Sequence, residues 1–193
     1  MDEKFVVYSD EKRGIELKNV FNFETGMGVA EKVIELISSA CHRIELAGSL
    51  RRKCVTVHDV DIIIHPIFTQ MDVVDLFDSL HQTIYIPEVL RNALVNYTKI
   101  TDETKIIRFK MQNVPVELYL CEPDGNNFEA LWQMRTGSAE HNRNLAVRAR
   151  NKNLLYRAGY GIFRDIERID DGTEAGIYKA LGLDYPKPES RVQ

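Results

Sequence analysis

The stretch AGSLRRKCVTVHDVDIII, which begins at Ala47, constrains the fold most strongly. Its end, from Asp59 to His65, alternates in the way that is typical of a strand. Successive side chains of a strand point to opposite faces, so Asp59 and Asp61 share one face and the apolar residues face a core. Two bare carboxylates about 6–7 Å apart along one strand repel each other. Either one of them is neutral, or a divalent cation lies between them.

The residues upstream of the two aspartates predict a phosphate-binding turn. The run HRIELAG alternates as a strand that ends at Gly48, and Ser49 opens a short helix over residues 50–53. Backbone N–H groups and a hydroxyl at such a turn can hold a phosphate, and Arg52 can add a charge-assisted pair of hydrogen bonds. The spacing therefore predicts a triphosphate cradle beside a metal site.

A third carboxylate, Glu117, lies on a predicted β-hairpin whose arms are TKIIRFKM and VPVELYL. In the second arm the apolar residues share one face, and Glu117 shares the other with Tyr119. If this arm lies beside the strand of Asp59 and Asp61, three carboxylates converge. Such a cluster can hold two Mg²⁺ ions about 3.5–4 Å apart, the arrangement used for in-line phosphoryl transfer.

The remaining patterns predict an α+β fold in two lobes. An α+β lobe over residues 1–123 has a mixed or antiparallel sheet with flanking helices, and a smaller, mostly helical lobe covers residues 124–193. The loop Glu122–Asn127 is the boundary. The first lobe is expected to hold a strand pair in Met1–Val20 and helices over Thr25–Cys41 and Thr69–Thr83. The second is expected to hold helices over Phe128–Met134, Ser138–Asn153 and Thr173–Leu181.

The net charge of −4 argues against a generally adhesive nucleic-acid binder, but basic residues concentrate between Met134 and Arg157. Four of them are candidate DNA contacts: Arg143, Arg148, Arg150 and Lys152. No apolar run approaches the roughly 20 residues that cross a bilayer, and the start lacks a signal-peptide layout. The three cysteines fit no zinc motif, so we expect reduced thiols in an intracellular protein. We also expect no membrane contact, and a monomer, since nothing in the sequence argues for an oligomer.

The pattern Gly-Ser, nine residues, then Asp-apolar-Asp resembles the signature of the nucleotidyltransferase superfamily. The run TGSAEHNRNLAVRARNKN, followed by YGIF and IYKALGLDYPKPESR, resembles the C-terminal subdomain of family X DNA polymerases, the group of DNA polymerase beta. The resemblance covers about Ala47 to Arg191. The layout is most similar to the reduced viral members, with a nucleotidyltransferase palm and a thumb-like lobe that binds the nascent base pair. We therefore expect an enzyme without lyase activity and without proofreading activity.

The resemblance implies that Asp59, Asp61 and Glu117 are the catalytic residues and ligate two Mg²⁺ ions, for which Mn²⁺ can substitute. Asp59 and Asp61 would ligate both ions. Glu117 would ligate the catalytic ion and help to accept the proton of the primer 3′-hydroxyl.

The resemblance also implies a set of nucleotide-binding residues: Gly48, Ser49, Arg52, His58, Gly137 and Asn142. Ser49 and Arg52 would bind the incoming deoxynucleoside triphosphate. Gly137 would let the backbone approach its sugar, and Asn142 would contact the minor-groove edge of its base. His58 stands where a glycine is usual, and would lie near the triphosphate.

Three departures from the family pattern bear on selectivity. Glu117 replaces the usual aspartate, which would alter the preference between Mg²⁺ and Mn²⁺. Met134 and Arg135 replace an aromatic pair that crowds the sugar 2′ position, so we expect weak discrimination against ribonucleotides. Ala146 replaces an arginine that packs under the templating base, which favours low fidelity.

The leading interpretation is a family X DNA-directed DNA polymerase that fills short gaps in DNA repair. A second is a nucleotidyltransferase of the same fold that acts without a template or on RNA. A third is a non-catalytic DNA-binding subunit of a repair assembly. This last one leaves three clustered carboxylates unexplained, since unpaired buried charges cost several kcal/mol.

Overall fold

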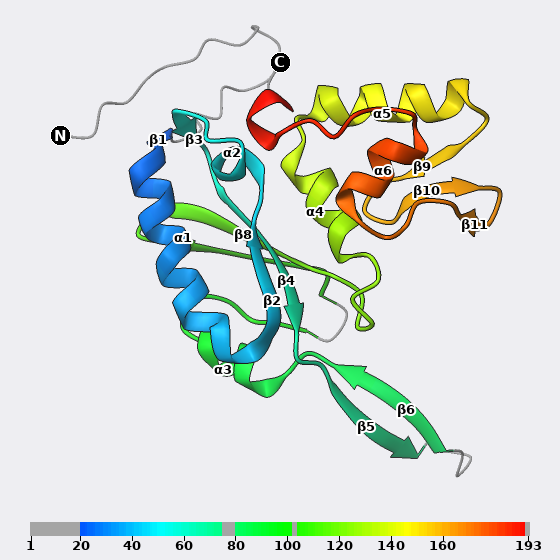
Figure 1. Ribbon diagram of the computed structural model, residues 1–193. Helices are drawn as coiled ribbons and strands as arrows, with labels where there is room; N and C mark the ends of the chain where they lie inside the picture. The colour runs from blue at the N-terminus through cyan, green and yellow to red at the C-terminus, as the bar shows by residue number, and fades with distance from the viewer. Residues whose placement is uncertain (1–19, 75–79, 102–103, 192–193) are drawn as a thin grey trace, which may run out of the picture.

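The computed structural model describes residues 20–74, 80–101 and 104–191 (Figure 1). The chain has mixed α/β structure with several helices and both antiparallel and mixed sheets, in agreement with the predicted α+β class. The strand pair predicted for Met1–Val20 falls, apart from its last residue, outside the described residues. Within the described ranges, no helix has the length and apolar character needed to cross a membrane.

The centre of the fold is a four-stranded sheet in the order β2-β4-β8-β7. The strands are β2 Cys41–Leu46, β4 Val60–Pro66, β8 Val114–Leu120 and β7 Ile106–Met111. Strands β4 and β8 are parallel, and the other two pairings are antiparallel. The strand of the paired aspartates and the strand of Glu117 therefore lie side by side, as predicted.

A two-residue turn connects β7 to β8 and allows the two strands to form a tight hairpin. Gln112 and Asn113 have φ values of 53° and 66°, the left-handed conformation that a tight hairpin turn requires at both positions. Pro115 has no N–H to donate, yet β8 is an interior strand. The pairing with β4 begins only at Val116, opposite Val60, so Pro115 precedes that ladder.

Two groups of helices cover the two faces of the sheet. On one face, α1 Phe23–Ile37 and α3 Glu88–Leu94 pack on a large apolar core with the buried side chains of β4 and β8 (Figure 1). Asn22 caps α1 by accepting a hydrogen bond from the N–H of Thr25, so this helix begins earlier than predicted. A short 3-10 turn, η1 Ser38–Ala40, leads from α1 to β2. The helix α4 Phe128–Thr136 covers part of the other face, against Ile63 and Tyr119.

The helix predicted over Thr69–Thr83 is wrong. The structure has two strands there, β5 Thr69–Val74 and β6 Leu80–Tyr85, paired in antiparallel register with Thr69 opposite Tyr85. The hairpin projects away from the sheet (Figure 1). Valines and threonines favour extended structure, and a short apolar run does not by periodicity alone distinguish helix from strand.

The C-terminal part carries the predicted helices, α4, α5 Ala139–Asn151 and α6 Glu174–Ala180, at the expected places. It also contains an antiparallel sheet in the order β11-β10-β9, which the prediction of a mostly helical lobe missed. Its strands are β9 Leu155–Arg157, β10 Gly161–Arg164 and β11 Glu167–Arg168. Such short strands leave almost no alternation to recognise. A final 3-10 turn, η2, spans Pro188–Arg191, and the division into lobes at residue 123 stays a prediction.

Candidate active site

The sheet brings the predicted carboxylates to adjacent strands. Asp61 lies directly opposite Glu117 in the parallel pairing of β4 with β8. Asp59 lies in the bend just before β4, and both aspartates are half-buried. His58 precedes Asp59 in the same bend and is exposed.

The predicted phosphate-binding turn packs against Asp61. The helix α2 Gly48–Arg51 follows β2, and the N–H of Ala47 donates a 2.9 Å hydrogen bond to the carbonyl of Asp61. Gly48 has a φ of 55°, and a Cβ atom there would overlap the Asp61 carboxylate, so only glycine fits. The Oγ of Ser49 is buried without a hydrogen-bond partner in the described part of the chain. An unpartnered buried hydroxyl beside a carboxylate pair suits a ligand that brings its own oxygen atoms.

The electrostatics of Asp61 reflect this crowding. The pKa of its carboxyl is raised to about 7, first by burial and then by the negative charges of Asp59 and Glu117. Tyr119 and Arg135 act in the opposite direction, through a hydrogen bond and a positive charge.

Glu117 is engaged by two neighbours. Its Oε1 accepts a hydrogen bond from Arg108 Nε at 2.8 Å, and its Oε2 accepts one from the hydroxyl of Tyr119. Although burial raises the pKa of Glu117, the bonds from Tyr119 and Arg108 bring it below the ordinary value. In the described residues, no three His, Cys, Asp or Glu side chains are arranged as a ready metal site.

Three residues of this site were missed from the sequence. Arg108 lies opposite Glu117 in the β7–β8 register, so the hairpin turn could have identified it. Tyr119 was placed on the face of Glu117, but nothing indicated its hydrogen bond. The guanidinium of Arg135 lies 3.9 Å from the centre of the Tyr119 ring, and its buried Nε has no hydrogen-bond partner among the described residues.

The donor set suits a hard divalent cation, because Mg²⁺ prefers carboxylate oxygens. Asp59 and Asp61 supply such oxygens, and a cation would relieve the repulsion that contributes to the raised pKa of Asp61. Glu117 fits only after its carboxylate has left Arg108 and Tyr119.

The two arginines of the Gly-Ser-Leu-Arg-Arg run join α2 to the C-terminal part. Arg51 forms a bidentate pair with Glu174 on α6 and donates to the hydroxyl of Thr136 at 2.6 Å. Its side chain is only 11% exposed, which identifies a structural ion pair. Arg52 donates to the carbonyl of Thr136 at 2.5 Å, and its buried Nε has no partner in the described residues.

Gly137 and Asn142 lie together at the turn between α4 and α5. A Cβ atom on Gly137 would lie 2.8 Å from Asn142 Oδ1, so the glycine gives this side chain room. Asn142 Nδ2 donates to the carbonyl of Met134 at 2.7 Å. Through Thr136, which Arg51 and Arg52 both contact, this turn is joined to α2.

The structure fixes the rotation of α5 and separates the four candidate DNA contacts. All four residues are exposed, and Arg143 and Arg150 are seven residues apart, so these two share one side. Arg148 donates to the carbonyls of Leu181 and Gly182, at 3.0 and 3.2 Å, and so holds the end of α6.

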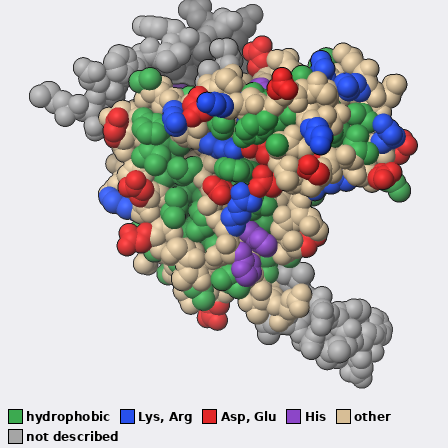
Figure 2. All heavy atoms as spheres, viewed as in Figure 1, with side chains coloured by type: hydrophobic (Ala, Val, Ile, Leu, Met, Phe, Trp, Pro, Cys, Tyr) green, Lys and Arg blue, Asp and Glu red, His purple; other side chains and the backbone are tan. Residues whose placement is uncertain are grey.

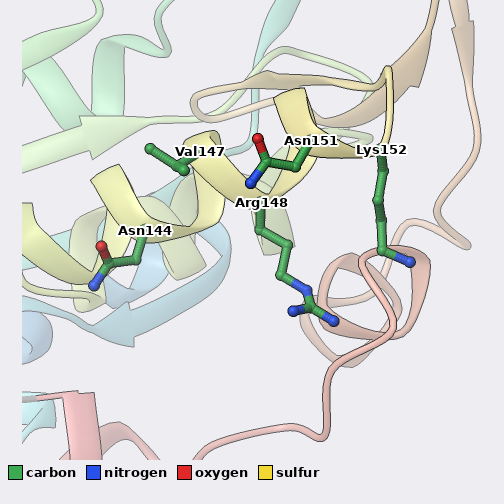
Figure 3. Close-up of a pocket in the computed structure, with 5 residues that line it drawn as sticks. All are labelled: Asn144, Val147, Arg148, Asn151 and Lys152. Carbon is green, nitrogen blue, oxygen red and sulfur yellow. The ribbon is translucent and has the colours of Figure 1, made fainter.

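Lys152 shares the side of Arg148, and both reach from α5 toward the segment after α6 (Figure 3). They line a shallow hollow of about 260 Å³ with three other residues: Asn144, Val147 and Asn151. Figure 2 shows basic side chains over this C-terminal part with acidic ones among them. The surface is therefore of mixed charge, and Arg143 and Arg150 are its best placed candidates for phosphate.

Comparison with known proteins identifies the C-terminal part of the chain. The family model of the DNA polymerase beta thumb matches residues 131–192. This span includes α5, α6 and the three short strands between them. A search of curated proteins finds no match for the chain. Residues 131–192 are thus similar to a DNA polymerase beta thumb, which supports a DNA polymerase beta-like relationship and DNA binding.

Proposed function

We propose that this chain is a family X DNA-directed DNA polymerase that adds deoxynucleotides to a primer 3′-hydroxyl by two-metal-ion phosphoryl transfer. One observation carries the proposal: Gly48 packs against the Asp61 carboxylate while Glu117 lies opposite Asp61. The predicted phosphate-binding turn thus lies against the carboxylates, on a chain that also carries a segment similar to a DNA polymerase beta thumb.

The nucleotide would bind through the turn. The unpartnered Ser49 hydroxyl and the Nε of Arg52 would donate to triphosphate oxygens, as would backbone N–H groups of α2. Asp59 and Asp61 would hold two Mg²⁺ ions, or Mn²⁺ in their place. Bound ions would neutralise charge that develops on the transferred phosphoryl group.

Glu117 would accept the proton of the primer 3′-hydroxyl and bind the catalytic ion. In the structure both of its oxygens are engaged, by Arg108 and Tyr119. Glu117 therefore has to exchange partners when substrate arrives. Its side chain is one methylene longer than aspartate, which gives it the reach for that exchange.

DNA would contact the exposed side of α5. Arg143 and Arg150 would bind backbone phosphates, which position the duplex without reading its sequence. Arg148 would act indirectly, since its guanidinium holds α6 in place.

Two observations favour a second candidate function, nucleotide addition without a template or onto RNA. Arg135 lies on Tyr119 beside the carboxylates, where an aromatic residue is usual. Ala146 is exposed on α5 and presents only a methyl group. Neither side chain would test the shape of a base pair or of a sugar as strictly as its larger counterpart. A non-catalytic DNA-binding subunit is a third candidate.

Single-nucleotide extension of a primer at a one-nucleotide gap, in Mg²⁺, tests the proposal. Wild type should add the nucleotide, and Asp61→Asn should be at least about 1,000-fold slower, as expected when a metal ligand in phosphoryl transfer is lost. Asp124→Asn, in an exposed loop, is the matched control and should keep full activity. DNA binding without any nucleotide addition would favour the non-catalytic subunit instead.

A further inference from the structure

A fully buried glutamine lies beneath the proposed nucleotide site. Gln133, on α4, is 0% exposed and neighbours the apolar cluster between α5 and α6. A buried carboxamide without partners costs free energy, so a glutamine is kept in such a place only when its amide is satisfied. The partners of Gln133 therefore show what it does.

Both ends of the Gln133 amide are fixed. Its Oε1 accepts a 2.8 Å hydrogen bond from the hydroxyl of Tyr156. Its Nε2 donates to Asn142 Oδ1 at 3.1 Å and, more weakly, to the hydroxyl of Tyr178 at 3.4 Å. The Tyr156 hydroxyl can donate or accept, and here it donates to the oxygen end of the Gln133 amide, so the NH₂ end faces Asn142.

The Asn142 amide is held at both ends, by the carbonyl of Met134, which can only accept, and by Gln133. Asn142 Oδ1 faces the Gln133 donor, and Asn142 Nδ2 faces the carbonyl of Met134 at 2.7 Å. If the Asn142 amide were flipped, its NH₂ group would face the NH₂ group of Gln133, and its oxygen would face the carbonyl oxygen of Met134. The NH₂ group has two protons, and Met134 takes one, so one N–H of Asn142 is left for a ligand.

We infer that Gln133 is a positioning residue, itself held by Tyr156, that fixes the Asn142 carboxamide so that it offers an N–H to the base of the incoming nucleotide. The inference rests on the proposed function. An N–H in this orientation matches the acceptors that every base presents in the minor groove, N3 of purines and O2 of pyrimidines. Asn142 would therefore test that a base is correctly seated without favouring one of the four.

A purely structural role for Gln133, as a link between α4, α5 and β9, predicts different behaviour. Its loss would lower stability and activity with all nucleotides alike. A positioning role predicts a loss specific to nucleotides that have the minor-groove acceptor. A nucleotide analogue that lacks only the minor-groove acceptor atom distinguishes the structural role from the positioning role.

The experiment compares dATP with 3-deaza-dATP, which has a C–H in place of N3, for addition opposite a template thymine at a one-nucleotide gap. The readout is the ratio of kcat/KM for dATP to kcat/KM for the analogue. Wild type should show a ratio of about 10, the value of one hydrogen bond. Asn142→Ala should bring the ratio to about 1.

Gln133→Met keeps the volume and removes the amide, and it should bring the ratio close to that of Asn142→Ala, mainly through KM. The double variant, Gln133→Met with Asn142→Ala, should have a ratio no lower than that of either single variant. Tyr156→Phe frees the Gln133 amide with little loss of packing, and should lower the ratio in the same direction. Tyr178→Phe is the matched control, because it removes a hydroxyl that contacts Gln133 and, at 2.9 Å, His141 but leaves the bond from Gln133 to Asn142, so it should keep the wild-type ratio.

A wild-type ratio in both Gln133→Met and Tyr156→Phe would overturn the inference and leave the proposed function intact. If Gln133→Met fails to fold, Tyr156→Phe alone decides. A lowered ratio in Tyr178→Phe equal to that of Tyr156→Phe would also overturn it, because general loosening of the lobe would then explain both. If wild type adds no nucleotide at all, the proposed function fails and the inference falls with it.

Discussion

Asp61 is a single residue whose proposed role in cation binding costs the protein folding stability. Its carboxylate is half-buried near two others, and its pKa is raised to about 7. An isolated structural carboxylate would gain nothing from such a place. The cost is understandable if the site exists to bind cations, because clusters of perturbed titratable groups are characteristic of functional sites.

Replacing Asp61 by asparagine should stabilise the protein in metal-free buffer. The amide keeps the shape and removes a charge that burial and two neighbouring carboxylates disfavour. We expect a Tm at pH 8 that rises by a few degrees, corresponding to about 1 kcal/mol. A fall in Tm at pH 8, with Asp124→Asn unchanged, would show that Asp61 is held by favourable structural contacts instead.

Gly137→Ala should impair nucleotide binding with little loss of stability. Gly137 has a φ of −63°, which any residue adopts, so alanine causes no backbone strain. Its methyl group would press on Asn142 Oδ1, which Gln133 holds in place. We expect KM for dATP to rise about tenfold and the unfolding midpoint to move little. An unchanged KM would mean that Asn142 yields, and does not bind the base in a fixed orientation.

Much of the site could be predicted from single residues, and the rest depended on tertiary contacts. The alternation around Asp59 and Glu117 placed the carboxylates, and Arg108 could have been found from the hairpin register. Arg135 could not, because it reaches Tyr119 through the packing of α4 on the sheet. Local patterns do not encode such a contact.

Among the elements, the two hairpins differ in how strongly the sequence specifies them. The β7–β8 hairpin was predicted because its turn residues, Gln112 and Asn113, separate two arms that alternate cleanly. The β5–β6 hairpin was mistaken for a helix, since its apolar residues fit both periodicities. The short strands β9 to β11 were missed because no strand of two to four residues shows a period.

The rotation of α5 predicts which basic residues contribute to DNA affinity. Arg143→Gln and Arg150→Gln should each reduce the slope of log K against log salt by about 1 for a gapped duplex. Arg148→Gln should leave the slope nearly unchanged and lower the Tm, because its guanidinium holds α6. Equal slope changes for all three variants would contradict this assignment, because Arg148 would then contact DNA phosphate as Arg143 and Arg150 do.

At the scale of the whole molecule, a buried ionic cluster joins α2 to α6 and to the last described residues. Glu174 on α6 binds Arg51 of α2 and Arg191 near the C-terminus, and Arg191 is fully buried with an exposed fraction of 0%. Although burial raises the pKa of Glu174, the two arginines bring it below the ordinary value of 4.5. The ionised glutamate therefore stabilises the fold above that pH, and its contribution is lost as the pH falls through the lowered pKa.

Glu174→Gln should destabilise the protein at pH 7 by roughly 3–5 kcal/mol, because it leaves two buried guanidinium groups without a counter-charge. Between about pH 5 and pH 3, wild type should lose stability more steeply than Glu174→Gln, since the variant has no carboxylate to protonate there. Urea unfolding at several pH values measures both effects. Parallel pH profiles would contradict the assigned pKa shift.

The chain should unfold in one transition. Its single tryptophan, Trp132, donates to the carbonyl of Leu46 at 2.7 Å and lies 3.3 Å below the guanidinium of Arg51. Its fluorescence therefore reports the contact of α4 with the sheet. We expect fluorescence and far-UV circular dichroism to give the same midpoint in urea. A fluorescence change well before the loss of helix would show that the C-terminal part separates first.

The most direct test of the central claim is to ask which nucleotide is added at a one-nucleotide gap opposite each of the four template bases. A DNA-directed polymerase of low fidelity should prefer the complementary nucleotide at every template base, by a margin of about 100-fold, or near 3 kcal/mol. Addition of all four nucleotides at equal rates, regardless of the template, would contradict templated synthesis and favour an untemplated nucleotidyltransferase on the same fold.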